Sequence, residues 1–313
     1  MKNHLTDRRL KKHSEEERFY FSRNRLSRVF ESAEIIPFDD SSKFIIMSDC
    51  HRGNGSWSDD FSRNRNLFLA ALNYYFRNNF TYIELGDGDD LWENKYMSDI
   101  INVHRDVFWL LLKFYKHNRL YFIFGNHDMV KKNKQYVQEN LFQYYDDRAK
   151  RYISLFENIT CYEGLILQHT GTGRRIYLAH GHQVDFLNYT IWKVARFLVR
   201  YLWRPLNLFG VNDPTSAAKN YRKKETIEKR LTQWVKREKQ ALISGHTHRP
   251  MRPEPGEPPY FNAGSSIHPQ DITGLEIEDS KITLVKWNVQ TNDYDQLLIK
   301  REIVACPQKL EDY

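Results

Sequence analysis

The chain has 313 residues, of which 41% are hydrophobic and 14% aromatic, enough to bury a core within one large domain. Three scattered cysteines, Cys50, Cys161 and Cys306, exclude a disulfide framework and a thiolate zinc site. The charged N-terminus lacks the apolar core of a signal peptide, and no stretch approaches the roughly 20 apolar residues of a membrane span, so we expect a cytoplasmic protein.

The basic charge is concentrated in one segment. Lys and Arg number 47 against 40 Asp and Glu, a net charge of +7, and residues 186–240 alone hold 13 against 4, a surplus of +9. The rest of the chain is therefore slightly acidic. A local basic segment indicates an anionic partner, which could be a phosphorylated substrate, a lipid surface or nucleic acid.

Strands and helices alternate along most of the chain. Residues 1–42 are predicted to form a basic helical N-terminal extension. Short apolar runs then predict strands over 44–47, 81–85, 120–124, 176–179 and 241–244. Helical patterns fill the early gaps, over 63–77, 98–117 and 133–151. This alternation is typical of an α/β fold.

The end of the chain follows a different pattern. Runs over 272–278, 281–287 and 296–299 have no helix between them and predict an antiparallel set. We therefore expect a domain over residues 43–304, with a helical insertion at about 186–240 and a C-terminal tail over 305–313.

A cluster of polar residues follows each of the five early strands. The clusters are Asp49-Cys50-His51, Gly86-Asp87-Gly88-Asp89-Asp90, Gly125-Asn126-His127-Asp128, His180-Gly181-His182 and Gly245-His246-Thr247-His248. Strand ends of this kind meet at one edge of a sheet, where α/β proteins place their sites. Each cluster alone would be an ordinary turn, surface loop or calcium loop, but five together indicate one site.

The side chains in these clusters are metal ligands of a particular kind. Asp, Asn and His without Cys suit manganese, iron or zinc, and we expect manganese. Asp49 and His51 lie two residues apart, so on an extended backbone they would point the same way and turn Cys50 aside. The same spacing relates His246 to His248.

In this combination the sequence resembles the calcineurin-like metallophosphoesterase superfamily, whose motifs D-x-H, G-D-x-x-D, G-N-H-D/E, H and G-H-x-H occur here in order. The resemblance implies a four-layer αββα sandwich with a helical insertion and two divalent metal ions at one edge. It implies one metal on Asp49, His51 and His248, a second on Asn126, His180 and His246, and Asp87 as the bridge between them. Asp90, the last residue of its motif, would lie just outside the ligands.

Catalytic roles follow from the same resemblance. His127 matches the catalytic histidine of the family and should donate a proton to the leaving oxygen, with Asp128 orienting its ring. Arg52, directly after a ligand, would contact the phosphate or be an ordinary surface residue.

Within the superfamily the layout resembles the UDP-2,3-diacylglucosamine pyrophosphohydrolases, which carry a helical insertion between the fourth and fifth motifs. His127 and His182 differ from that branch, which usually has Arg and Asp at these positions. The identity of the substrate therefore stays open.

The insertion has a pattern of its own. Lys193, Arg196, Arg200 and Arg204 form one basic stripe at helical spacing, and apolar residues from Ile191 to Leu202 occupy the other side. Such a helix suits a bilayer interface or a lipid-like substrate, to which Lys193 and Arg196 would bind. Alternatively, its apolar side packs on the domain and the basic stripe is merely solvated.

The sequence thus predicts a phosphohydrolase that uses metal-activated hydroxide to cleave a phosphoester or pyrophosphate bond of a nucleotide-linked or lipid-linked substrate, at the inner face of the membrane or in the cytoplasm. A phosphodiesterase or nuclease acting on nucleic acid is the alternative within enzymes. A non-catalytic binding scaffold is disfavoured, because every expected ligand position is filled.

Overall fold

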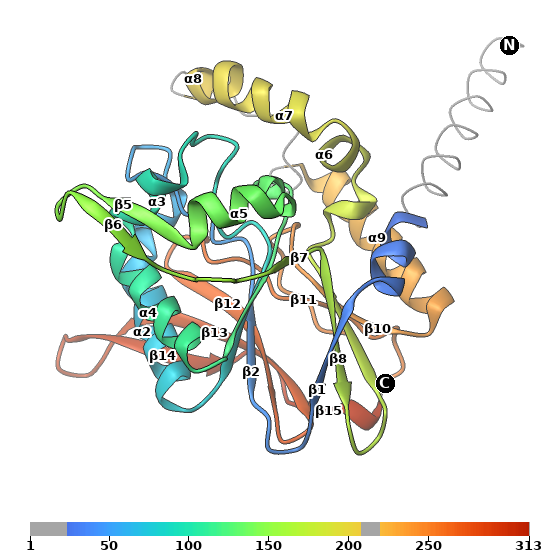
Figure 1. Cartoon of the computed structure of the whole chain (residues 1–313). Helices are drawn as coiled ribbons and strands as arrows, with labels where there is room; N and C mark the ends of the chain where they lie inside the picture. The colour runs from blue at the N-terminus through green and yellow to red at the C-terminus, as the bar shows by residue number, and fades with distance from the viewer. Residues whose placement is uncertain (1–23, 208–219, 313) are drawn as a thin grey trace, which may run out of the picture.

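The computed structural model describes residues 24–207 and 220–312, and it consists of two stacked β-sheets with helices on both outer sides (Figure 1). Three apolar clusters separate the layers. One fills the space between the sheets, one lies between the larger sheet and α2 and α4, and one lies between the smaller sheet and α9. This is the predicted four-layer αββα sandwich.

The larger sheet has the order β14-β13-β12-β2-β3-β4-β7, and β15 pairs with β13. Its strands are β2 Phe44–Met47, β3 Thr81–Leu85, β4 Leu120–Ile123, β7 Cys161–Tyr162, β12 Asp271–Glu278, β13 Lys281–Thr291, β14 Leu297–Ile303 and β15 Gln308–Lys309. From β2 to β7 the pairing is parallel, whereas β12 to β15 pair antiparallel, as the pattern without helices predicts.

The smaller sheet has the order β1-β8-β9-β10-β11. Its strands are β1 Glu34–Phe38, β8 Gly164–His169, β9 Arg175–Ala179, β10 Ala241–Ser244 and β11 Tyr260–Asn262. Two segments differ from the sequence-based boundaries. Glu34–Phe38, expected in the N-terminal extension, is an edge strand of this sheet, and Gln308–Lys309, expected in the tail, pairs with β13. The greater part of the predicted extension, residues 1–23, lies outside the described residues.

Helices on the larger sheet are η1 Asp60–Arg63, α2 Arg65–Arg77, α3 Met97–Val103, α4 Arg105–Lys116, η2 Met129–Lys132 and α5 Lys134–Leu141. The helix predicted over 133–151 ends at Leu141, where the hairpin of β5 Gln143–Asp146 and β6 Arg151–Ser154 begins. Adjacent Tyr144 and Tyr145 favour a strand, and Tyr144 is buried at 3% exposure.

The basic segment divides into two structural parts. Helix α9 Tyr221–Glu238 buries Ile227, Leu231 and Trp234 against the smaller sheet, so it belongs to the outer layer of the domain. The insertion that projects above the sandwich comprises η3 His182–Val184, α6 Phe186–Thr190, α7 Trp192–Leu198, π-helical η4 Val199–Trp203 and α8 Arg204–Asn207 (Figure 1). A short η5, Leu310–Asp312, ends the described chain. Among the described residues, no helix combines the length and the apolar character that crossing a bilayer requires.

Candidate metal centre

The loops after β2, β3, β4, β9 and β10 meet at one end of the sandwich, where six of the seven predicted ligands are buried and the side chain of His248 is 12% exposed. Backbone hydrogen bonds fasten neighbouring loops to one another. The amides of Asp49 and His51 donate to the carbonyls of Gly86 (3.0 Å) and Asp87 (2.9 Å), and the amide of Gly245 donates to the carbonyl of His180 (3.0 Å). The side chains are therefore positioned by the edges of both sheets.

The ligand loops have an unusual backbone conformation. Asp49, His51, Asp87, His246 and His248 all have positive φ, between 48° and 68°. This left-handed region is sparsely populated by residues other than glycine and tends to occur at functional sites. The prediction that Asp49 and His51 converge is confirmed, but the extended backbone assumed for it is wrong. Both turn inward through left-handed turns beyond the strand.

Two glycines allow the loops to approach so closely. Gly86 has a φ of 88°, and a Cβ atom there would overlap the imidazole of His180. A Cβ atom on Gly125 would overlap the carboxylate of Asp87. Side chains at these positions would push apart the groups that form the site.

Asp49, His51 and His248 form the first cluster. Nε2 of His248 lies 3.0 Å from Oδ1 of Asp49 and 3.2 Å from Nε2 of His51. Two imidazole nitrogens and a carboxylate oxygen converging in this way match the donor set of a divalent metal.

Asp87, His180 and His246 form the second cluster. Nδ1 of His180 donates to the carbonyl of Leu85 at 2.8 Å, which turns Nε2 toward Asp87, 3.2 Å from its Oδ2. Oδ1 of Asn126 is buried and makes no hydrogen bond to any described residue. A buried amide oxygen without a donor is costly unless a cation occupies the place of that donor. These residues therefore fit a metal.

Asp87 lies between the two clusters. Its Oδ2 is 3.2 Å from Nε2 of His180 and 3.8 Å from Nε2 of His51. Burial acts to raise the pKa of this carboxyl, but the neighbouring histidines outweigh it and lower the pKa, so Asp87 is ionised at neutral pH. The arrangement suits a carboxylate shared by two cations.

Cys50 and Thr247, which lie between ligand residues in the sequence, point away from the two ligand clusters, as the spacing predicts. Cys50 faces Ser266, with 3.6 Å between Sγ and Oγ, and burial raises the pKa of its thiol to about 12, so it stays protonated. Oγ1 of Thr247 donates to Glu228 at 3.0 Å.

His127 stands at the opening of the site. Its side chain is 22% exposed, and its ring lies 4.6 Å from that of His51 and stacks on Trp92 at 4.4 Å between centroids. Nδ1 lies 3.0 Å from Oδ1 of Asp90. Burial acts to lower the pKa of His127, but the charges of Asp90 and Asp87 prevail and raise it to about 9.

The expected partner of His127 was wrong. Asp128 was predicted to orient this ring, but its Oδ1 accepts from the amide of Gly125 (2.6 Å) and its Oδ2 from Lys131 (2.8 Å). Asp90, expected just outside the ligands, contacts the ring instead. Asp128 therefore holds the loop that carries Asn126 and His127.

Neither role considered for Arg52, a phosphate contact or an ordinary surface residue, agrees with the structure. Its side chain is fully buried, donates both terminal nitrogens to Glu84 at 2.7 Å, and donates Nε to Asp89 at 2.8 Å. Lys131 in turn bridges Asp89 (2.6 Å) and Asp128. The buried guanidinium has no surface to offer a substrate, so Arg52 serves to connect the loop after β2 to β3 and the loop that follows β3, and Lys131 extends the connection to the loop after β4.

One residue of the site carries no motif and was missed. Asp185, 3% exposed, has Oδ2 3.3 Å from Nε2 of His246 and also contacts Lys223 (2.8 Å) and Asn188 (2.9 Å). Ligating histidines usually donate their second ring N–H to such a carboxylate. Asp185 would therefore leave Nδ1 of His246 free for a metal. A lone aspartate five residues after His180 offers no sequence signal.

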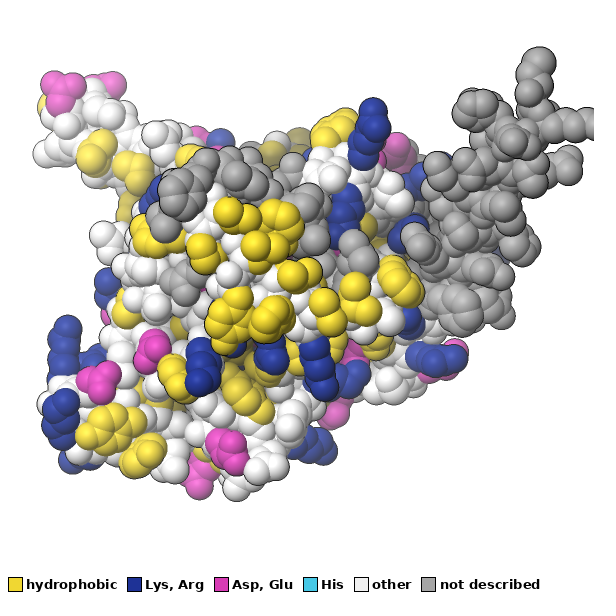
Figure 2. Space-filling model, turned by 90° about the horizontal axis from the view of Figure 1, so that it is seen from above, with side chains coloured by type: hydrophobic (Ala, Val, Ile, Leu, Met, Phe, Trp, Pro, Cys, Tyr) yellow, Lys and Arg dark blue, Asp and Glu magenta, His cyan; other side chains and the backbone are white. Residues whose placement is uncertain are grey.

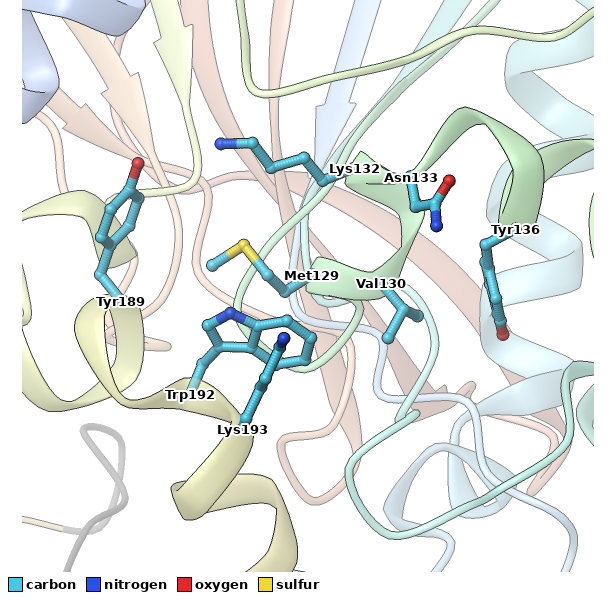
Figure 3. A pocket seen from close by; sticks show the side chains of 8 residues that line it. All are labelled: Met129, Val130, Lys132, Asn133, Tyr136, Tyr189, Trp192 and Lys193. Atoms are coloured by element: carbon cyan, nitrogen blue, oxygen red, sulfur yellow. The ribbon is translucent and has the colours of Figure 1, made fainter.

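A cavity of about 530 Å³ opens beside the site, between η2 and the insertion. Figure 3 shows Met129 and Trp192 at its centre and Tyr189 and Tyr136 at its two ends. Lys132, Lys193, Val130 and Asn133 complete the lining. The cavity is thus mostly apolar, with two ammonium groups, and it borders the loop that carries His127.

The insertion helix does not have the two separate sides that its sequence predicts. Arg200, expected on a solvated stripe, donates to the carbonyls of Leu91 (2.7 Å), Trp92 (3.0 Å) and Asn94 (3.0 Å) and so anchors η4 to the domain. Arg196 lies over the ring of Trp192, 4.9 Å from its centroid. The side chain of Arg204 lies outside the described residues.

Apolar residues of the insertion face both ways. Ala195 and Val199 pack against Trp92, whereas Val194 (54% exposed), Phe197 (60%) and Tyr201 (61%) point to solvent. Seen from above, apolar side chains spread over the face formed by the insertion, with Lys and Arg side chains among and beside them (Figure 2). Packing on the domain accounts for only one side of the helix.

Comparison with known proteins identifies the family. The model of the calcineurin-like phosphoesterase family matches residues 42–250, more than half of the 313-residue chain. The chain belongs to this family. It is therefore a metal-binding hydrolase that acts on phosphoester bonds, as its motifs predict. No curated protein matches the chain.

Two solved structures are similar to it. One is a conserved uncharacterised protein and predicted phosphoesterase from Streptococcus pneumoniae TIGR4, with 16% identity, a TM-score of 0.32, and coverage of 84% of this chain and 97% of that one. The other is Vps29 from Chaetomium thermophilum, with 10% identity, a TM-score of 0.33, and coverage of 85% of this chain and 97% of that one.

Proposed function

We propose that this phosphoesterase holds two divalent metal ions and hydrolyses a phosphate ester or pyrophosphate of an amphiphilic substrate. The observation that carries the proposal is the pair of ligand clusters on either side of Asp87, with the unpaired oxygen of Asn126 beside them. Asp49, His51 and His248 would hold the first ion, and Asn126, His180 and His246 the second. The donor set favours manganese, with iron or zinc as alternatives.

A pair of such ions supplies a hydroxide nucleophile near neutral pH and neutralises the phosphoryl oxygens. The protein's own groups then complete the reaction. His127 lies beside His51 at the opening and would donate its proton to the leaving oxygen, while Asp90 holds the ring through Nδ1. The raised pKa of His127 favours the protonated ring that this role requires.

The cavity beside the site supports an amphiphilic substrate. Met129, Trp192 and Tyr136 would bury an apolar group, and Lys132 and Lys193 would pair with phosphate or pyrophosphate oxygens. Arg196, at the same helix, remains a second candidate for this contact. A lipid-linked or nucleotide-linked pyrophosphate has both parts, in keeping with the resemblance to the UDP-diacylglucosamine branch.

The exposed side of the insertion supports contact with an anionic membrane surface. Val194, Phe197 and Tyr201 would enter the interface, and Lys193, next to Val194 in the chain, would meet anionic headgroups. The protein would then act at the inner face of a membrane, on a substrate that diffuses within it.

The first test of the catalytic proposal is hydrolysis of bis(p-nitrophenyl) phosphate and p-nitrophenyl phosphate with added Mn²⁺ and after chelation. Asp87→Ala should abolish both turnover and metal binding, whereas His127→Ala should abolish turnover and retain the metal. Cys306→Ser, at an exposed position, is the matched control. Purified protein that binds no divalent metal would refute the proposal.

A second test addresses the substrate class. Activity on a lipid-linked pyrophosphate that falls in Trp192→Ser and Lys193→Ser, with turnover of the nitrophenyl esters unchanged, would support the amphiphilic substrate. Salt-sensitive binding and cleavage of DNA or RNA would instead favour the phosphodiesterase or nuclease alternative.

A further inference from the structure

Strand β14 forms an exposed apolar edge of the larger sheet. Within residues 24–207 and 220–312 its one strand neighbour is β13. Leu297 is 75% exposed, Leu298 49%, Ile299 41% and Ile303 52%, and Val304 directly beyond the strand is 51% exposed. In Figure 1 the β13–β14 hairpin extends sideways from the body, away from the insertion.

This edge lacks two of the features that normally prevent strand pairing, a bulge and a proline. Natural edge strands are blunted by bulges, proline, or charges placed on them. Here seven consecutive residue pairs join β14 to β13 without a bulge, and residues 297–305 contain no proline. The charges on the strand are Lys300, Arg301 and Glu302, and Arg301 is paired with Glu276, which is buried.

We propose that β14 pairs antiparallel with β14 of a second copy of this chain, joining the two larger sheets across a two-fold axis. Such an axis stands normal to the sheet, because only then does the second strand lie alongside the first with reversed direction. Opposing residues must then lie on the same face of the sheet. The axis therefore passes midway between one residue and the same residue of the second copy.

The side chains select the register centred on Arg301. There Ile299 opposes Ile303, and Leu298 opposes Val304. Lys300 opposes Glu302 on both sides of the axis, so four opposite charges form two pairs. Apolar cross-strand pairs and opposite-charge pairs are the contacts that stabilise antiparallel strands.

The neighbouring registers oppose unfavourable groups. Centring the axis on Lys300 sets Lys300 against its own copy and Leu298 against Glu302. Centring it on Glu302 sets two carboxylates together. In the favoured register Arg301 meets its own copy, but Glu276 compensates its charge within each chain.

The proposal is independent of the proposed function. The two-fold axis reverses the direction of β2, β3 and β4 in the second copy, so the two metal sites would face opposite ways. The dimer would therefore present one insertion at a time to a given membrane.

The test is the mass of the full chain in solution, measured by sedimentation velocity between about 1 and 200 µM. The wild-type protein should form a concentration-dependent dimer. Lys300→Glu should raise the dimer dissociation constant about tenfold, because it replaces two attractive pairs by two repulsive ones. Lys113→Glu, the same change at an exposed site on α4, is the matched control and should leave the dimer intact.

Charge exchange tests the register itself. Glu302→Lys should also weaken the dimer, although it also removes contacts to Lys286, Asn288 and Gln290 within the chain. Mixing Lys300→Glu with Glu302→Lys should restore a heterodimer, and so should combining both changes in one chain. A wild-type monomer at the highest concentration would overturn the proposal, as would a dimer that Lys300→Glu leaves unchanged or a mixture that fails to associate.

Discussion

Asp185 should control metal affinity although it is not itself a ligand. Its carboxylate lies 3.3 Å from Nε2 of His246 and 2.8 Å from the ammonium of Lys223. Burial acts to raise its pKa, but the contacts with His246 and Lys223 prevail and lower it to about 2, so it is ionised at neutral pH. The anion keeps the proton of His246 on Nε2 and thereby frees Nδ1.

Asp185→Asn keeps the shape of the side chain but removes this charge. The amide can donate as well as accept, so the preference for one tautomer of His246 is lost. Outer partners of ligating histidines typically contribute 10–100-fold to metal affinity, so we expect Mn²⁺ to bind about tenfold or more weakly, equivalent to roughly 1.4 kcal/mol.

Calorimetric titration of metal-free protein with Mn²⁺ measures this effect directly. Asp59→Asn is the matched control, because Asp59 is a buried carboxylate 2.8 Å from Nε2 of His104, which is not among the predicted ligands. It should reduce stability and leave metal affinity unchanged. Equal Mn²⁺ affinity in wild type and Asp185→Asn would refute this account of how His246 is oriented.

Three further predictions concern other parts of the molecule. Asp90→Asn should lower kcat by about 10²-fold or more and retain the bound metal. Asp128→Asn should mainly reduce the urea concentration at the midpoint of unfolding. If Asp128→Asn lost as much kcat as Asp90→Asn and no stability, the pairing of His127 with Asp90 would be contradicted. Arg52→Met should destabilise the fold by about 3–5 kcal/mol in urea unfolding, because Glu84 is left buried without a counter-charge, and a change near zero would contradict this. Phe197→Ser should reduce co-sedimentation with anionic vesicles and leave p-nitrophenyl phosphate hydrolysis unchanged, and undiminished vesicle binding would contradict the proposed role of the insertion.

The residues that converge on the site could be predicted because each follows a short strand that the sequence marks clearly. Three strands have the predicted bounds: Phe44–Met47, Thr81–Leu85 and Ala241–Ser244. The first two are neighbours and pair in parallel. The contacts among side chains beyond the strand ends could not be predicted. Asp128 adjoins His127 in sequence, but its carboxylate binds Gly125 and Lys131, and Asp90, 37 residues earlier, contacts the ring.

Partners distant in sequence were missed for a related reason. Glu34–Phe38 lies next to a basic helical segment, and its place in the smaller sheet depends on β8, some 130 residues later. From the sequence Arg52 could be an exposed residue beside a ligand, because its acceptors, Glu84 in strand β3 and Asp89 in the loop after it, are more than 30 residues away. Such tertiary pairings override what local pattern indicates.

The buried charges around Arg52 explain how the strained ligand loops persist. A non-glycine residue in the left-handed region costs about 1–2 kcal/mol, and five ligands adopt it. Arg52 joins the loop after β2 to Glu84 of strand β3 and to Asp89 of the loop after β3, and Lys131 joins Asp89 to Asp128. Asp128 then accepts from the amides of Gly125 and Asp87.

This chain of ion pairs fixes the loops after β2, β3 and β4 relative to one another. Breaking one of its buried ion pairs would cost several kcal/mol, about as much as the strain of two or three left-handed residues. Because the network uses none of the metal-binding side-chain atoms, it holds Asp49, His51 and Asp87 in place before a metal binds. The loop with His246 and His248 lies outside this network. Weakening the network should therefore lower stability and metal affinity together, whereas loss of Asp185 should lower metal affinity alone.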